Sequence, residues 1–112
     1  MKILYTNFHG GNGGGHDTYI YHLAAGLGRR YRVAVASPAG SRLSRMVDTL
    51  PGVRIVDMQF KPCWRTFLPE LVRLRRLIQQ SAFDIIHVNG SADHRQVMLA
   101  LVGCRTRPSV VF

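Results

Sequence analysis

The chain is organised around the stretch His9-Gly10-Gly11-Asn12-Gly13-Gly14-Gly15-His16-Asp17, which joins an apolar, strand-like run to an amphipathic, helix-like one. Five of its nine residues are glycine. Because glycine has no Cβ, the backbone here can take positive φ and approach a ligand closely. The stretch also leads into a helix start, where free N–H groups and the positive end of the helix dipole favour an anion such as phosphate. The alternative is a flexible glycine turn between strand and helix.

Strand-like and helix-like patterns alternate along the rest of the chain. The first expected helix carries apolar side chains at the i, i+3, i+4 and i+7 spacing of an amphipathic helix, and Asp17 lies in its first turn. Ser41 and Ser91 are expected to cap two later helices. The expected strands cover residues 2–7, 32–37, 53–58, 84–88 and 109–112, and the expected helices cover residues 17–27, 42–49, 70–80 and 91–103, with a loop over residues 59–69.

This alternation predicts βαβ units with right-handed crossovers. The expected fold class is α/β: a Rossmann-like, doubly wound parallel sheet in three α/β/α layers, truncated at or in the fifth strand. In such sheets, ligands bind at the carboxyl ends of the strands, where the strand order reverses. The glycine stretch follows the first strand and Asn89-Gly90-Ser91 follows the fourth, so both are expected to flank that crevice.

Composition narrows the class of protein. The 112 residues are 46% hydrophobic and 19% charged, which is typical of one globular domain. Fifteen basic against six acidic residues give a net charge of +9 and favour anionic partners. Nucleic acid is not expected as a partner, because no zinc spacing, recognition-helix motif or aromatic RNA-binding strand is present.

Cys63 and Cys104 have no metal-ligand spacing, so we expect no metal site and we expect both thiols to be reduced. Without a signal peptide or a membrane-spanning run, the protein is expected to be cytoplasmic, either soluble or peripheral on the inner membrane face.

Two common phosphate-binding fingerprints do not fit the glycine stretch. Started from Gly11, the dinucleotide pattern G-x-G-x-x-G requires glycine where His16 stands. The second strand also ends in Ala36-Ser37 rather than in an acidic residue that would hold a ribose. A Walker A loop started at Gly10 reaches His16-Asp17 where Lys-Ser/Thr is required. The pattern therefore argues against a dehydrogenase and against a P-loop ATPase.

Two motifs resemble those of family 4 glycosyltransferases of the GT-B fold. The family opening G-G-x-E-x-x-V-x-x-L-A-x-x-L is similar to Gly14-Gly15-His16-Asp17-Thr18-Tyr19-Ile20-Tyr21-His22-Leu23-Ala24-Ala25-Gly26-Leu27. The family strand D-[IV]-[IV]-H-x-H is similar to Asp84-Ile85-Ile86-His87-Val88-Asn89, and the order of strands agrees across all 112 residues. Asp17 replaces the usual Glu and Asn89 replaces the second His, so acceptor contacts on that loop are expected to differ.

The resemblance implies a glycosyltransferase that moves a sugar from a nucleotide-sugar donor to a glycan or lipid-linked acceptor, in bacterial surface polysaccharide or lipopolysaccharide synthesis. Residues 1–112 would be the N-terminal, acceptor-side Rossmann-like domain, incomplete and without the C-terminal donor domain. The catalytic residue is expected beyond Phe112, so this chain alone is expected to be inactive. No cofactor or metal is implied. The alternative is a stand-alone, non-catalytic module that binds nucleotides or other anions.

The resemblance also suggests roles for individual residues. In the family the glycine loop approaches the donor diphosphate, which here implies Gly13, Gly14 and Gly15. The candidates for acceptor or substrate contact are polar residues at the expected crevice, with turn, helix-cap and solvated roles as the alternative: His16, Asn89, Ser91 and His94. His87 is expected to be a hydrogen-bonded interior histidine.

The loop 59–69 and the helix after it form the candidate membrane surface. Phe60, Trp64 and Phe67 could enter a bilayer interface while basic side chains meet anionic headgroups. The contact candidates are Lys61, Trp64, Arg65, Arg73 and Arg76. The alternative is an ordinary helix with a solvated basic face and with its aromatic side chains packed inward.

Overall fold

The computed structural model describes residues 1–11, 13–60, 64–104 and 107–111. Strands and helices alternate throughout. The strands are β1 (Lys2–Thr6), β2 (Arg32–Ser37), β3 (Val53–Asp57), β4 (Ile85–His87) and β5 (Ser109–Val111). The helices are α1 (Gly15–Leu27), α2 (Arg42–Val47), α3 (Phe67–Ser81) and α4 (Ser91–Ala100).

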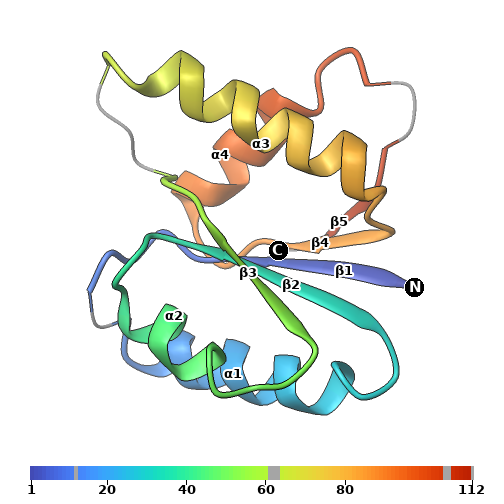
Figure 1. Ribbon diagram of the computed structural model, residues 1–112. Coiled ribbons are helices and arrows are strands. Elements are labelled where there is room, and N and C mark those ends of the chain that lie inside the picture. Colours follow the sequence, from blue (N-terminus) through green and yellow to red (C-terminus); the bar gives the residue numbers. More distant parts are fainter. Residues whose placement is uncertain (12, 61–63, 105–106, 112) are drawn as a thin grey trace.

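The five strands form one parallel sheet in the order β3-β2-β1-β4-β5. Helices α1 and α2 cover one face of the sheet, and α3 and α4 cover the other (Figure 1). The strand order reverses between β1 and β4, so that β1 lies beside β2 on one side and beside β4 on the other. The predicted doubly wound, three-layer α/β/α fold is confirmed.

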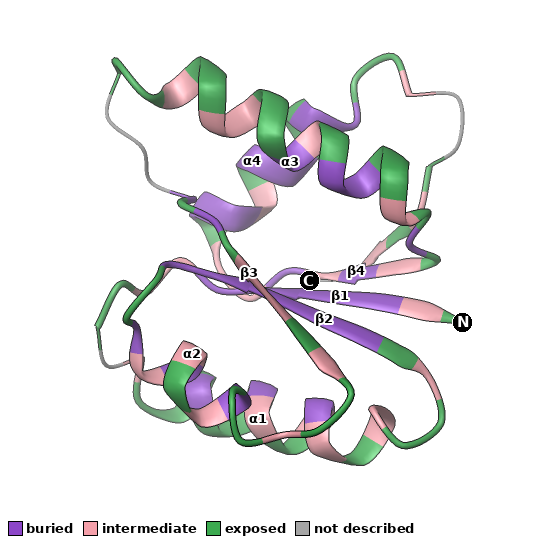
Figure 2. Cartoon of the chain, in the orientation of Figure 1, coloured by how far each residue is buried: buried purple, intermediate pink, exposed green. Residues whose placement is uncertain are grey.

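The sheet has a separate hydrophobic core on each face, because successive strand residues point to opposite sides. On the first face, Ile3 and Tyr5 of β1 pack with Ile20 of α1. On the second face, Leu4 of β1 packs with Leu74 of α3 and with Val97 of α4. Figure 2 shows the buried residues along β1 and β2 and on the inward sides of the helices.

The helix starts differ in detail from the sequence prediction, and α1 begins at Gly15 rather than at Asp17. The predicted loop 59–69 ends earlier, because α3 begins at Phe67 and Pro69 lies in its first turn. Proline is tolerated there, since a first-turn N–H has no partner within the helix. The predicted cap at Ser91 is wrong by one residue: Gly90 is the N-cap and Ser91 is the first helical residue. Ser41 does cap α2, because its side chain accepts a 3.1 Å hydrogen bond from the Ser44 N–H.

Candidate functional site

The candidate site lies where β1 and β4 end, at the point where the strand order reverses. The glycine stretch leaves β1 after Thr6, and the turn 88–90 leaves β4 after His87. The first segment leads into α1 and the second into α4, so the N-termini of both helices stand at the same edge of the sheet (Figure 1). This edge is the usual position of a ligand in open α/β sheets.

Asp17 fastens the glycine stretch to the protein. Its carboxylate is fully buried and accepts the Gly13 N–H at 2.7 Å, and the Arg42 guanidinium lies 3.5 Å from the same oxygen. A Cβ at Gly13 would lie 2.4 Å from Asp17 Oδ1, so no side chain fits there. Gly14 takes a φ of 60°, and a Cβ at Gly14 or at Gly15 would meet nothing within 4 Å. Gly13 therefore faces the protein, whereas Gly14 and Gly15 face open space at the start of α1.

Asn7 fixes the beginning of the stretch. Its side chain is buried, and its Nδ2 donates to the Ser37 hydroxyl at 3.0 Å and to the His9 carbonyl at 3.2 Å. The Ser37 hydroxyl lies 2.8 Å from that of Ser41, which caps α2. The glycine stretch is thus held at its start as well as at its end, although five glycines in nine residues suggest a flexible turn.

A second network joins β1, β4 and α4. The carboxylate of Asp93 is fully buried in the first turn of α4, and its Oδ2 accepts the Thr6 hydroxyl at 2.7 Å and the Asn89 N–H at 3.1 Å. The Asn89 side-chain amide donates to the Thr6 carbonyl at 2.9 Å and to the His87 carbonyl at 3.4 Å. Asn89 therefore joins the ends of β1 and β4. It does so through its backbone N–H and its side-chain amide, which are the groups that an acceptor contact would otherwise use.

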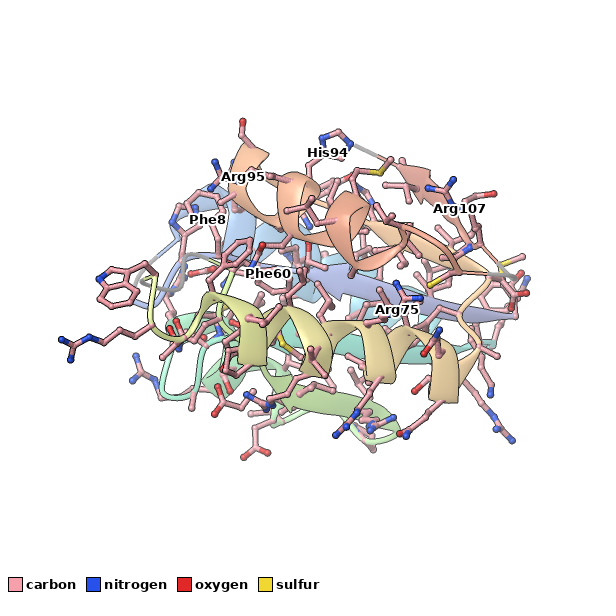
Figure 3. The ribbon with its side chains drawn as sticks, turned by 90° about the horizontal axis from the view of Figure 1, so that it is seen from above. Phe8, Phe60, Arg75, His94, Arg95 and Arg107 are labelled. Carbon is pink, nitrogen blue, oxygen red and sulfur yellow. The ribbon has the colours of Figure 1, made fainter. Side chains whose placement is uncertain are left out.

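A hollow of about 530 Å³ opens beside these two networks. It is lined by Phe8, His16, Gly90, Ser91, Ala92 and Arg95. A Cβ at Gly90 would lie 2.3 Å from Cε1 of Phe8, so the Phe8 ring rests directly on the backbone of that glycine. Phe8 and Arg95 lie at the same end of the molecule in Figure 3. An aromatic face, a basic side chain and a helix N-terminus therefore meet in one place.

The hollow brings together two of the four predicted acceptor residues, His16 and Ser91. His94 is half-buried on α4 and, like Asn89, does not line the hollow. Sequence reasoning missed Phe8 and Arg95. Arg95 stands four residues after Ser91 on the predicted helix, so the helical spacing alone could have placed the two on one face.

The side chains of His9 and His16, near the two ends of the glycine stretch, contact each other. Nε2 of His9 lies 3.4 Å from Nδ1 of His16, and the two ring centroids are 5.3 Å apart. The Phe8 ring lies 4.0 Å from the ring of His9, between centroids. Two imidazoles beside an exposed helix start can donate hydrogen bonds to an anion held there.

His87 lies on the α1 side of the sheet and does not line the hollow. Its ring packs 5.3 Å from Tyr5 and 5.9 Å from Tyr19, between centroids, and is half-buried. Burial lowers the pKa of His87 below its ordinary value, because the charged imidazolium loses hydration. Burial, and then the neighbouring Tyr19, raise the pKa of Tyr5. The strand neighbours predicted a hydrogen-bonded interior histidine, whereas the ring is half-buried against two aromatic side chains.

The candidate membrane surface is apolar and basic at the start of α3. Trp64 is 83% exposed, and the Arg65 guanidinium carbon lies 5.3 Å from its ring centroid. Arg73 donates to Glu70 at 2.9 Å and to the Asp57 carbonyl at 2.9 Å, while Arg76 is exposed. Lys61 lies outside the described residues, as does Cys63.

The aromatic side chains of this segment do not all face outward. Phe60 is 1% exposed and packs in the core formed with α3 and α4, so the prediction that it enters a bilayer interface is wrong. Phe67 is half-buried at the first position of α3. A one-dimensional pattern could not separate Phe60 from Trp64, because neither lies in a segment with regular periodicity.

Among the described residues, no three histidine, cysteine or acidic side chains are grouped as a metal ion would require. No helix in this part of the chain combines the length and apolar character needed to cross a bilayer.

Comparison with known families identifies the chain. The model for Glycosyltransferase Family 4 matches residues 13–112, from the glycine stretch to the last residue. The chain belongs to glycosyltransferase family 4. The resemblance seen in the two sequence motifs is therefore confirmed. Among curated protein sequences, none matches this family 4 chain.

Solved structures share the fold of this family 4 chain at low sequence identity. HepE from Anabaena, solved with UDP and glucose, superposes with a TM-score of 0.73 at 17% identity over 100% of the chain. MurG from Acinetobacter baumannii superposes with a TM-score of 0.70 at 14% identity over 97% of the chain. The chain covers 29% of that HepE chain and 33% of the MurG chain, so it spans a third or less of the length of these two proteins.

Proposed function

We propose that this chain is the acceptor-side domain of a glycosyltransferase that moves a sugar from a nucleotide-sugar donor to a glycan or lipid-linked acceptor, in bacterial surface polysaccharide or lipopolysaccharide synthesis. The proposal rests on one observation at the edge of the sheet. The exposed glycines at the start of α1 lie next to the hollow at the start of α4, because His16 of α1 lines that hollow. A donor and an acceptor must meet in this way for group transfer. The reaction needs no metal or cofactor from this chain.

Gly14 and Gly15 form the donor side of the proposed site. Gly14 is the N-cap of α1 and Gly15 is its first residue, and both are exposed where the partial positive charge of the helix start favours a diphosphate. The N–H of Gly13 is already donated to Asp17, so Gly13 serves by holding the loop in shape. HepE, solved with UDP and glucose, shares this fold, which favours a nucleoside diphosphate as the donor group.

The hollow forms the acceptor side. Phe8 offers an aromatic face to the C–H groups of a sugar ring, and Ser91 and Arg95 offer hydrogen bonds to its hydroxyl or anionic groups. Arg95 suits an acceptor that carries a phosphate or carboxylate, because guanidinium groups bind such oxyanions in a bidentate manner.

Nuclear magnetic resonance titration of the chain with UDP tests the donor side. We expect shifts at the amides of Gly14 and Gly15. Gly15→Ala should weaken UDP binding several-fold without lowering the melting temperature, because a Cβ there meets no protein atom but obstructs a ligand. Gly26→Ala is the matched control, since it adds a Cβ in open space at the other end of α1. Equal UDP affinity in both variants would contradict the donor assignment.

The alternative function is a non-catalytic module that binds nucleotides or other anions. The same titration separates the two functions when it is repeated with pyrophosphate and with UDP-glucose. An acceptor-side domain should show shifts at Phe8, Ser91 and Arg95 on addition of anionic glycans, and the double variant Phe8→Ala with Arg95→Gln should remove them. Glycans that leave these amides unshifted, together with pyrophosphate that binds as tightly as UDP-glucose, would favour the module.

We also propose that the start of α3 contacts an anionic membrane on the cytoplasmic side, where a lipid-linked acceptor would be presented. Leu68 and Val72 are exposed four residues apart on α3, so they lie on one face of the helix, and Trp64 is exposed in the turn just before it. Arg65 and Arg76 are exposed near these side chains and can meet lipid phosphates, while Arg73 is shared with Glu70. Interfacial tryptophan and arginine side chains combine in this way on peripheral proteins.

Co-sedimentation with vesicles tests the membrane contact. The chain should bind vesicles that contain phosphatidylglycerol more tightly than vesicles of phosphatidylcholine alone. Trp64→Ala with Leu68→Ala should weaken binding to both, whereas Arg65→Gln with Arg76→Gln should weaken only the charge-dependent part. Met98→Ala with Leu99→Ala is the control, since these apolar side chains are exposed on α4 instead. Binding unchanged by Trp64→Ala with Arg73→Glu would contradict the membrane proposal.

A further inference from the structure

A second cavity lies at the opposite edge of the sheet from the glycine stretch. Its volume is about 500 Å³, and it is lined by Lys2, Arg32, Val33, Ala34, Gly52, Arg54, Gln80, Ser81 and Phe83. Lys2 and Arg32 are the first residues of β1 and β2, and Arg54 is the second residue of β3. The cavity is therefore separated from the candidate site by the length of a strand, roughly 15 Å.

The floor of this amino-edge cavity is apolar. Ala34 and Phe83 line it and belong to the core on the α3/α4 face of the sheet, whereas the Val33 side chain packs in the core on the other face. Ala34 and Phe83 provide a surface on which a small apolar group would lose contact with water, which favours binding in proportion to the area covered.

The rim of the amino-edge cavity is basic. Lys2 Nζ donates to the Ser81 carbonyl at 2.9 Å, and Arg54 donates to the Ser81 hydroxyl at 3.2 Å, so one residue holds both cations beside the cavity. Arg32 is exposed on the strand between β1 and β3. Asp84 is nearby and accepts the Lys2 backbone N–H at 2.7 Å, but among the described lining residues none is acidic.

Three positive charges around one cavity repel each other unless an anion lies among them. Guanidinium and ammonium groups bind phosphate and carboxylate through short, charge-assisted hydrogen bonds. We propose that the amino-edge cavity is a second binding site, which takes a small amphipathic anion: its apolar part lies on the floor beside Phe83, and its phosphate or carboxylate group is bound by Lys2, Arg32 and Arg54. The site is independent of the donor and acceptor groups.

Titrations with four small probes test the site. Phenyl phosphate and benzoate carry both features, inorganic phosphate carries only the charge, and benzyl alcohol carries only the ring. The proposal expects phenyl phosphate or benzoate to bind more tightly than either single-feature probe, with amide shifts at Gly52, Ser81 and Phe83. The stronger of the two identifies the preferred anion. Benzyl alcohol or inorganic phosphate binding as tightly as both amphipathic probes would overturn the proposal, as would shifts confined to Gly14 and Gly15.

Variants that remove single charges identify the side chains that bind the anion. Arg32→Gln and Arg54→Gln should each lower phenyl phosphate affinity by about fivefold or more, because each removes a charge-assisted contact. Arg45→Gln removes an equal charge from an exposed position on α2 and should leave the affinity unchanged. Equal losses in all three variants would mean general attraction by the net charge of +9 and would overturn the proposal. Resonance spectra of each variant without ligand confirm that the fold is retained.

Discussion

The Thr6 hydroxyl donates a 2.7 Å hydrogen bond to Asp93 Oδ2 and so joins the end of β1 to the first turn of α4, 87 residues later in the chain. The carboxylate is fully buried and takes a second hydrogen bond from the Asn89 N–H. Its place in the first turn of the helix also favours its charge. Asp93 therefore helps to fix the two segments that border the hollow to one another, together with the Asn89 side chain, which donates to the Thr6 carbonyl.

Replacing Thr6 by Val should destabilise the chain by about 1–3 kcal/mol, because the buried carboxylate loses a donor while the side-chain shape is kept. Chemical denaturation measures the loss. Thr6→Ser keeps the hydroxyl and is the control, with a smaller effect from the lost methyl group. A Thr6→Val variant as stable as the Ser variant would show that the hydrogen bond contributes nothing.

Replacing Gly90 by Ala should displace the Phe8 ring, since the new Cβ would lie 2.3 Å from Cε1 and 2.7 Å from Cδ1 of that ring. Overpacking of this kind typically costs about 1–3 kcal/mol. Thermal unfolding gives the stability, and resonance shifts of Phe8 report the displacement. Gly10→Ala is the control, because a Cβ there meets nothing within 4 Å. An unmoved Phe8 in Gly90→Ala would contradict the packing described here.

Gly13 and Gly15 should respond in opposite ways to the same change. In Gly13→Ala the added Cβ would lie 2.4 Å from Asp17 Oδ1, so the loop must shift and the variant should be destabilised. In Gly15→Ala the Cβ enters open space at the first residue of α1, where Ala is the better helix former. Denaturant titration of both variants distinguishes these outcomes. Similar losses in the two would mean that Asp17 does not hold the loop.

Replacing Ala82 by Gly should increase the stability of the chain. It caps α3 at a φ of 53° in the left-handed region, where a side chain is unfavourable. We expect Ala82→Gly to stabilise the chain by about 0.5–1 kcal/mol. Ala25→Gly, inside α1, should instead destabilise by about 0.5–1 kcal/mol. A loss of stability in Ala82→Gly would show that its left-handed conformation is not strained.

Stability should fall in mild acid because of His87. In the unfolded chain this histidine titrates near its ordinary pKa of about 6.5, whereas burial lowers its pKa in the folded chain. Below that ordinary pKa the unfolded state binds more protons, so the free energy of unfolding rises with pH. The contribution is fully present above about pH 6.5 and is lost as the pH falls toward the folded-state pKa.

Denaturant titrations at pH 7.5, 6.5 and 5.5 measure this dependence. His87→Gln should flatten the curve between the lower two values, by less than the limit of about 1.4 kcal/mol per pH unit for one proton, because the ring is only half-buried. Identical curves for the parent chain and His87→Gln would refute the assignment.

The sequence by itself determined the fold class and the edge of the sheet where the site lies. Alternation of strand and helix patterns requires a parallel sheet with helices on both faces, and local signals such as the Ser41 cap act through neighbouring backbone groups. The position of the glycine stretch after the first strand then places it at the carboxyl edge. The family could be predicted for the same reason, because its motifs lie within continuous segments of sequence.

Only the tertiary structure decided which residues of each segment face the site. Gly13 and Gly15 are equivalent in sequence, yet a buried carboxylate stands against the first and open space against the second. Phe60 is buried and Trp64 exposed, and Phe8 reaches the hollow only because Gly90, 82 positions later, has no side chain. These differences depend on contacts between residues far apart in the chain, and close packing decides them within a few tenths of an ångström.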